Sequence, residues 1–316
     1  MFCWHNVEAT WFFSQSQPPG VGAPRLRRQL RAVKRAWNVM PLETAVADLA
    51  EGRPLPPRAA ALSFDDGYRD NLELALPILE ELGLHATFFL VPGFLSGTEE
   101  SWWERLGWAF ANAGADRLEW DGQEWPLATA ADRDAALDVI AERLKIHSHH
   151  QRRMMSAEIS KRLQPTMPAL LDRLYMDWDG AAELVRRGQG IGSHTMRHAI
   201  LARETPEAQA EDLAEASALL ERRLGVDVSL LAYPNGQAHD FDTATIEATR
   251  AAGITAAFTT VPGMSTAAID PYALPRVVVA PVMTPREYAG TAKGLAKEAL
   301  RLRIAGREEP RRERVA

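Results

Sequence analysis

Four side chains able to bind a metal ion or transfer protons lie in two short motifs of this 316-residue chain. The first motif places Asp65 and Asp66 directly after the apolar run 60–64, and a glycine follows them. Successive side chains of an extended segment point in different directions, so one carboxylate can bind an ion while the other faces a substrate. The alternative explanation is an Asp-Asp-Gly turn whose side chains cap the following helix.

The second motif places His194 and His198 after another apolar run, 190–193. A spacing of four puts both imidazoles on one side of a helical turn, where their nitrogens can converge on one ion. A surface pair of histidines is the alternative. With a carboxylate of the first motif, the pair makes a three-ligand set that leaves positions for water and substrate, as catalytic metal sites require.

A third motif, Leu-Ala-Tyr-Pro-Asn-Gly at 231–236, also ends an apolar run in a turn. Its backbone N–H groups could face a metal site and hold an oxyanion, although its composition alone indicates no more than a turn. Loops at the carboxyl ends of strands are where barrel enzymes place catalytic groups, so all three motifs occupy suitable positions.

Short buried strands that alternate with amphipathic helices are expected to position these motifs. Gly83, Gly225 and Gly253 lie where helix C-terminal caps are expected. Alternation of strands and helices predicts an α/β fold with a mostly parallel sheet or barrel. The expected strands are 2–4, 60–64, 86–91, 190–193, 230–233, 256–259 and 277–280, and the expected helices include 71–82, 206–224 and 242–252.

A segment from about 97 to 176 interrupts the alternation with mainly helical patterns. We expect a helical insertion with a small hairpin at 117–127. Its tryptophans are expected in the core of the insertion, although one or two could also serve as a sugar platform. Its histidines fit a solvated helix face better than a metal site, because no carboxylate ligand is obvious. These residues are Trp102, Trp103, Trp108, Trp120, Trp125, His147, His149 and His150.

The composition limits the class of protein. Hydrophobic residues make up 46% and charged residues 25%, which is typical of a globular protein with a substantial core. The net charge of −6 argues against a general nucleic-acid role. Cys3 is the only cysteine, so an internal disulfide and a multi-cysteine zinc site are excluded, and a small buried hydrophobe is expected.

No apolar run is long enough to span a bilayer, and no secretory signal is visible. We therefore expect a cytoplasmic location for the chain as given, or an exported one if a leader was removed. The segment 293–316 is expected to form a basic helical tail. Solvation is the default for such a tail, with weak contact to a membrane surface or a protein as the alternative.

The motifs and their order resemble the polysaccharide deacetylase family, carbohydrate esterase family 4. Its members carry a T/S-F-D-D-G motif, then an H-[ST]-x-x-H motif, then a strand-end motif containing proline. Here the first two read Ser-Phe-Asp-Asp-Gly at 63–67 and His-Thr-Met-Arg-His at 194–198. The resemblance covers nearly the whole chain outside the insertion and tail. It implies a deformed (β/α) TIM-like barrel of about seven strands, in a domain that we expect to cover 1–292.

By this resemblance, Asp66, His194 and His198 would bind a divalent ion, with Asp65 as the general base. Zn²⁺ fits the ligands best, and Co²⁺, Ni²⁺ or Fe²⁺ would also fit. A backbone N–H, taken to be that of Tyr233, would hold the oxyanion. The implied reaction is hydrolytic removal of N-acetyl groups from an N-acetylated amino-sugar polymer or glycan.

The sequence departs from the family in its proton donor. The usual Leu-x-His motif near the end of the domain is missing, since no histidine follows position 239. The opening Trp-His-Asn-Val at 4–7 resembles the Y-H-x-[IV] start of a subgroup that includes exopolysaccharide and biofilm deacetylases. A barrel closes on itself, so a first-strand residue can replace one from the last strand. We therefore expect His5 to be the general acid, with a histidine that merely caps the strand as the alternative.

A second departure concerns the third motif, where family members often have an arginine that orients the base and this chain has Ala232. We expect Arg276 to reach Asp65 in its place. The remaining alternatives for function are a deacetylase of lipid-linked or nucleotide-linked amino sugars, an amidohydrolase of a non-sugar amide, and a non-catalytic carbohydrate-binding homologue. An intact set of two aspartates and two histidines argues against the last of these.

Overall fold

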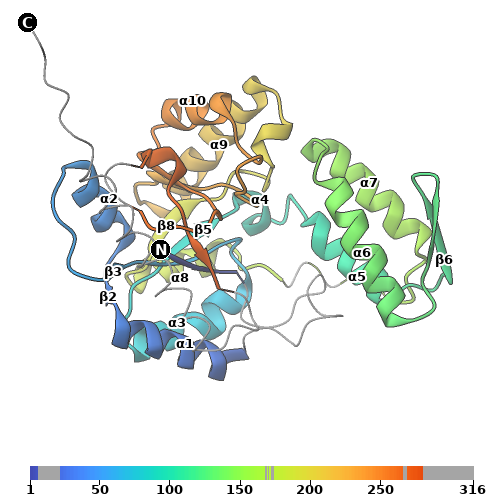
Figure 1. The fold of residues 1–316 in the computed structure, drawn as a ribbon, viewed down its shortest axis with the longest axis horizontal. Coiled ribbons are helices and arrows are strands. Elements are labelled where there is room, and N and C mark those ends of the chain that lie inside the picture. Colours follow the sequence, from blue (N-terminus) through green and yellow to red (C-terminus); the bar gives the residue numbers. More distant parts are fainter. Residues whose placement is uncertain (6–21, 168, 170, 172–173, 266–268, 280–316) are drawn as a thin grey trace, which may run out of the picture.

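Seven parallel strands form one curled sheet, which makes a half-closed barrel covered by helices (Figure 1). The computed structural model describes residues 1–5, 22–167, 169, 171, 174–265 and 269–279. The strand order is β10-β9-β8-β5-β4-β1-β11. A parallel bridge between Phe258 and Leu274 brings the two edges of the sheet together. The strands are β1 Phe2–Trp4, β4 Leu62–Phe64, β5 Thr87–Leu90, β8 Gly190–Ser193, β9 Leu230–Ala232, β10 Ala256–Phe258 and β11 Val277–Val278.

Each of the seven expected apolar runs contains one of these strands, which confirms the deformed α/β barrel. Nearly all strand residues are buried, as expected for a parallel sheet covered on its faces. The strands are one or two residues shorter than the runs in several cases, and position 280 lies outside the described residues. The boundary expected at 292 and the basic tail at 293–316 also lie outside them.

Helices connect the strands, and Gly83, Gly225 and Gly253 have the left-handed backbone expected of C-terminal caps. α9, Pro206–Leu224, begins after the N-cap Thr205 and ends at Gly225, whose φ is 67°. α10, Thr243–Ala251, begins with a capping box at Asp242. The other helices around the barrel are α1 Gly22–Ala36, α2 Leu42–Ala50, α3 Leu76–Glu81, α4 Pro92–Leu95 and α8 Trp178–Arg186, with short 3₁₀ turns η3 Leu201–Arg203 and η4 Pro271–Ala273.

The helix expected at 71–82 consists of two parts. Its first turns form a π-helix, η1 Asn71–Ala75, which continues directly into α3. Pro77 has no N–H to donate, so an unbroken α-helical ladder cannot run through this stretch. A small two-stranded sheet, β2 Asn38–Val39 and β3 Ala59–Ala60, lies beside α2.

The insertion forms a separate lobe (green in Figure 1) with its own hydrophobic cluster. It contains α5 Trp102–Ala111, α6 Ala130–Leu144 and α7 His149–Arg162, and the expected hairpin is present as β6 Arg117–Trp120 and β7 Gln123–Pro126. Trp102, Trp103 and Trp108 are buried in this cluster. The same cluster includes Tyr68 and Phe94 of the barrel, so it extends from the lobe onto the barrel.

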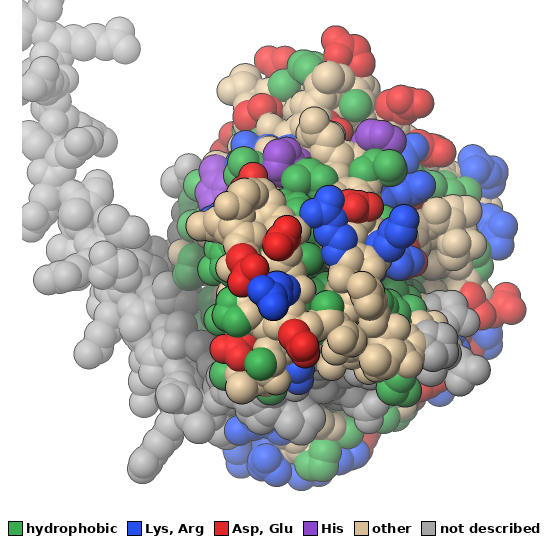
Figure 2. Space-filling model, turned by 90° about the vertical axis from the view of Figure 1, so that its right-hand side faces the viewer, with side chains coloured by type: hydrophobic (Ala, Val, Ile, Leu, Met, Phe, Trp, Pro, Cys, Tyr) green, Lys and Arg blue, Asp and Glu red, His purple; other side chains and the backbone are tan. Residues whose placement is uncertain are grey.

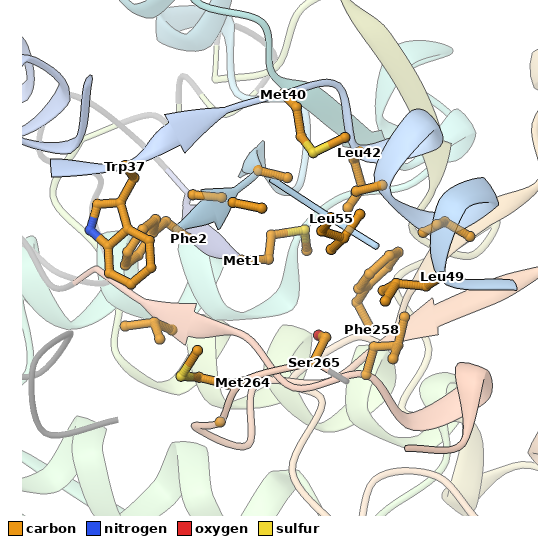
Figure 3. Close-up of a pocket in the computed structure, with 18 residues that line it drawn as sticks. Met1, Phe2, Trp37, Met40, Leu42, Leu49, Leu55, Phe258, Met264 and Ser265 are labelled. Atoms are coloured by element: carbon orange, nitrogen blue, oxygen red, sulfur yellow. The ribbon is translucent and has the colours of Figure 1, made fainter. Parts of the chain in front are cut away.

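The amino end of the barrel carries an apolar pocket of about 100 Å³ (Figure 3). Met1 and Phe2 at the start of β1 and Leu42 and Leu49 of α2 line it. Side chains at this end of a barrel serve stability rather than catalysis. Among the described helices, none combines the length and apolar character needed to cross a membrane.

Candidate metal centre

The motif residues lie at the carboxyl ends of adjacent strands. His5 follows β1, Asp65 and Asp66 follow β4, and His194 follows β8. Because the strands are parallel and neighbours in the order β8-β5-β4-β1, these ends meet at one edge of the sheet. The N–H of Asp65 donates to the Trp4 carbonyl at 2.9 Å, which fixes the register between the first two of these loops.

Three ligand atoms converge in the manner of a metal site. Asp66 Oδ1 lies 3.3 Å from Nε2 of His194 and 3.3 Å from Nε2 of His198. A tetrahedral ion bound at about 2.1 Å holds two ligand atoms about 3.4 Å apart, so this spacing fits zinc. Asp66 Oδ1 is buried and forms no hydrogen bond within the described part of the chain. The donor set and its unsatisfied oxygen therefore fit a divalent ion.

The pKa values of the two imidazoles are shifted in opposite directions. Burial lowers the pKa of His198 to about 4, so its ring is neutral at pH 7 and able to bind a metal. The pKa of His194 is raised, because contacts with Asp66 and Asp65 outweigh the opposing effect of burial. The Nδ1 of His194 donates to the Ala232 carbonyl at 2.7 Å, which directs Nε2 toward Asp66.

The loop that carries the histidines is not the helical turn that their spacing predicted. Thr195 and His198 have left-handed backbone, with φ of 65° and 54°, which a right-handed helix excludes. Such conformations cost about 1–3 kcal/mol each in residues other than glycine and collect at functional sites. Asp66 has φ of 73° in the facing loop, so strained backbone occurs in both halves of the site.

Hydrogen bonds from other elements hold this loop in place. The N–H of Met196 donates to Asp212 Oδ1 of α9 at 2.6 Å, and the Met196 carbonyl accepts the N–H of Gly93 at 3.0 Å. Within the loop, Thr195 Oγ1 accepts the N–H of Ala199 at 3.2 Å. Asp212 is buried, and burial raises its pKa to about 6.

Asp65 forms a buried ion pair with Arg276, which precedes β11 and lies two strands from β4 in the sheet. Nη1 of Arg276 donates to Asp65 Oδ1 at 2.8 Å, and Nη2 lies 2.8 Å from Oδ2. Nε of Arg276 donates to the Thr259 carbonyl at 3.0 Å, which orients the guanidinium. Burial alone would raise the pKa of Asp65, but the charges of Arg276, His194 and His5 outweigh it and the pKa is lowered.

His5 lies close to Asp65. Its ring, the Cys3 thiol and a carboxylate oxygen of Asp65 offer atoms within 4.8 Å of one another. The carbonyl of His5 accepts a hydrogen bond from Asn71 Nδ2 at 2.7 Å. Burial raises the pKa of Cys3 and keeps the thiol protonated, and Arg276 already faces both Asp65 oxygens. This cluster is therefore poorly suited to a second ion.

Tyr233 does not present its N–H as the sequence led us to expect. That N–H donates to the Phe258 carbonyl at 3.0 Å, because β9 pairs with β10, and the hydroxyl donates to the Tyr272 carbonyl at 3.0 Å. The group is thus unavailable to an oxyanion. Two residues later, the N–H of Asn235 has no acceptor in the described residues, and its φ of 57° marks the turn after β9.

The insertion supplies groups near the metal centre that the motifs did not reveal. The ring of Trp103 lies 4.4 Å, between centroids, from the ring of His198. His149 Nε2 lies 3.3 Å from Glu99 Oε2, so this histidine has a carboxylate partner that the sequence did not suggest. His149 and Glu99 line a cavity of about 320 Å³ between the lobe and the barrel. The face around the lobe carries histidines and charges of both signs (Figure 2).

Comparison with known proteins identifies the family of this curled parallel barrel. The model of the polysaccharide deacetylase family matches residues 52–257. The Bacillus subtilis (strain 168) protein YxkH, named as a polysaccharide deacetylase, is 22% identical over 227 residues. That match covers 72% of this chain and 53% of YxkH, so the chain spans about half the length of this curated relative.

Solved structures agree in fold. The Streptococcus pyogenes deacetylase PplD, in complex with acetate, superposes with a TM-score of 0.62 at 15% identity over 92% of this chain and 96% of its own. IcaB from Ammonifex degensii gives a TM-score of 0.56 at 18% identity, over 92% and 95% of the two chains. The chain belongs to the polysaccharide deacetylase family.

Proposed function

We propose that this protein removes N-acetyl groups by hydrolysis from an N-acetylated amino-sugar polymer or glycan. The supporting observation is the convergence of Asp66, His194 and His198 at 3.3 Å spacings beside the buried Asp65–Arg276 pair. PplD is named as a deacetylase and was solved with acetate, the product that such a reaction releases. A de-N-acetylase from Aggregatibacter actinomycetemcomitans shares the fold with a TM-score of 0.56 at 16% identity, over 92% of this chain and 98% of its own.

Asp66, His194 and His198 would hold the metal, and Zn²⁺ suits two imidazoles and one carboxylate best, with Co²⁺, Ni²⁺ or Fe²⁺ also compatible. When bound, such an ion polarises the acetamide carbonyl and lowers the pKa of water. Asp65 lies next to these ligands and its lowered pKa keeps it ionised at neutral pH, as a general base must be. Arg276 holds both of its oxygens and so fixes the direction from which it accepts a proton.

In this scheme Asp65 accepts a proton from the water that attacks the acetamide carbon. His5 donates a proton to the amide nitrogen as the carbon–nitrogen bond breaks, and acetate and a free amine leave. The Asn235 N–H, rather than that of Tyr233, is the backbone group that we assign to the oxyanion. Removing one side-chain donor from the oxyanion hole of another hydrolase costs about 10²–10³ in rate, which gives the scale of such a contribution.

Acetate release from N-acetylglucosamine oligomers tests the proposal. Protein dialysed against a chelator and reloaded with Zn²⁺ should release acetate, while the chelated protein and an Asp66→Ala variant should not. The same assay on lipid-linked and nucleotide-linked N-acetyl sugars separates the neighbouring substrate classes. Binding of the oligomers without acetate release by any metal-loaded form would instead identify a carbohydrate-binding homologue.

A further inference from the structure

The contacts that fix the orientation of the His198 imidazole differ from those that fix His194. Histidines that bind metals are ordinarily aligned by a hydrogen bond from their second ring nitrogen. His194 has such a bond to the Ala232 carbonyl. The Nδ1 of His198 is buried and has no hydrogen-bond partner among the described residues. Some other contact must therefore set the direction of its Nε2.

Aromatic rings from the junction with the insertion provide that contact. Within the described part of the chain, the rings that approach His198 are those of Trp103, Phe94 and His194, at centroid distances of 4.4, 6.3 and 4.9 Å. Trp103, in the first turn of α5, is the nearest and is only 8% exposed. The indole of Trp103 therefore packs against the imidazole of His198, whose Nδ1 has no hydrogen-bond partner among the described residues.

A hydrogen-bonded chain fixes Trp103 in turn. Its Nε1–H donates to the hydroxyl of Tyr68 at 3.1 Å, and this hydroxyl donates to Glu104 Oε1 at 2.8 Å. Tyr68 and Glu104 are 2% and 0% exposed. Leaving a buried donor without its acceptor is destabilising, which favours the arrangement in which both of these hydrogen bonds form. The indole plane is therefore held firmly.

We propose that Glu104, Tyr68 and Trp103 act as a positioning chain that holds the His198 imidazole for metal binding, so that the insertion is a working part of the metal centre. The chain begins on α5, passes through Tyr68, two residues after Asp66, and returns to α5. The inference rests on the metal ligands assigned under the proposed function. It adds residues that touch neither the ion nor the substrate.

Metal affinity, measured by competition with a coloured chelator, tests the chain without recourse to turnover. Trp103→Phe and Tyr68→Phe should each weaken Zn²⁺ binding by about 10–100-fold, the usual effect of losing a residue that supports a metal ligand. In the Co²⁺-loaded protein the visible absorption bands should change as well, because they report ligand geometry. Glu104→Gln keeps an acceptor for the tyrosine and should cost less.

Trp108→Phe is the matched control. Trp108 lies on the same helix, belongs to the same hydrophobic cluster and is 6% exposed. It should lower the free energy of unfolding of the metal-free protein as much as Trp103→Phe does, yet leave Zn²⁺ affinity and the Co²⁺ spectrum unchanged. Equal effects of the two variants on affinity would show a merely structural role and overturn the proposal.

A double variant separates this route from a direct effect of Tyr68 on Asp66. If Tyr68 acts through Trp103, adding Tyr68→Phe to Trp103→Phe should weaken Zn²⁺ binding by less than twofold further. A full additional loss would refute the chain. If the wild type binds Zn²⁺ and all variants bind it with the same affinity, this inference alone is defeated. If the wild type binds no divalent ion, the proposed function is defeated as well.

Discussion

At the residue scale, the ion pair between Asp65 and Arg276 sets the protonation of the proposed base. Its guanidinium faces both carboxylate oxygens in a site where both side chains are buried. An adjacent arginine lowers the pKa of an aspartate by about 1–3 units. In Arg276→Met that pKa should therefore rise, and the acid limb of the pH profile of kcat/KM should move to higher pH by about 1–3 units.

Arg276→Lys is the control for this prediction, because it keeps the positive charge but loses the bidentate contact with the Asp65 carboxylate. It should shift the acid limb less than the methionine variant while still reducing kcat. An acid limb at the same pH in wild type and Arg276→Met would show that Asp65 is not the group that titrates.

His5, which we propose as the general acid, lies beside Asp65 at the end of β1, the strand next to β11 in the sheet. His5→Ala should reduce kcat by about 10²–10⁴, the usual contribution of a general acid, without changing bound metal. A substrate whose leaving amine is already activated should recover much of the loss. Near-full turnover of the alanine variant on the ordinary substrate would reject the role.

At the scale of elements, α9 controls the histidine loop through Asp212. The pKa of Asp212 is raised by burial to about 6, from an ordinary value of 3.8. The folded protein therefore binds a proton more tightly than the unfolded chain, so stability is lost as the pH rises from about 4 to about 6. Two pKa units correspond to about 3 kcal/mol.

Asp212→Asn removes that titration but keeps an oxygen for the N–H of Met196. The difference in free energy of unfolding between the variant and wild type should grow by about 2–3 kcal/mol, in favour of the variant, between pH 4 and pH 7. Urea unfolding of the metal-free proteins measures it. Parallel pH curves for the two proteins would be inconsistent with the raised pKa.

At the scale of the whole molecule, the proposed metal joins strands that are distant along the chain. Its ligands come from the ends of β4 and β8, and the lobe packs against the second of these loops through Trp103. An ion that binds only the folded state stabilises it, by about 4 kcal/mol when its concentration is a thousand times Kd. Thermal unfolding with and without Zn²⁺ should show this shift in wild type.

The matched variant for this measurement is Asp66→Ala, which removes one ligand from the set. It should unfold at the same temperature with and without Zn²⁺. A Zn²⁺-dependent shift of equal size in Asp66→Ala would place the stabilising ion elsewhere in the protein.

Local patterns were sufficient to predict much of the fold. The run 2–4 coincides with β1 and the amphipathic segment 206–224 with α9, because burial periodicity and capping residues act over a few positions. The prediction of a helical turn at 194–198 was wrong, because contacts with distant residues decide the backbone there. This backbone is held by Asp212 and Gly93, whose positions in the chain say nothing about this contact.

The hydrogen-bond partner of the Tyr233 backbone N–H could not be predicted from local patterns either. This N–H is engaged because β9 pairs with β10 in a register that places Phe258 opposite Ala232, a relation between two separate strands. Glu104 and Trp103 carried no motif, since their contacts with Tyr68 and His198 exist only after the lobe docks on the barrel. The available signal in the sequence was an acidic residue directly after two tryptophans, at 102–104.

The sequence by itself determined which chemical groups the protein has: two aspartates and two histidines at strand ends, a barrel to carry them, and no usual proton donor. Only the tertiary structure decided which atoms meet, including the 3.3 Å spacings around Asp66, the contact between Arg276 and Asp65, and the wall that Trp103 forms beside His198. Secondary structure follows from interactions between near neighbours in the chain, whereas the geometry of the site depends on contacts between residues up to 211 positions apart.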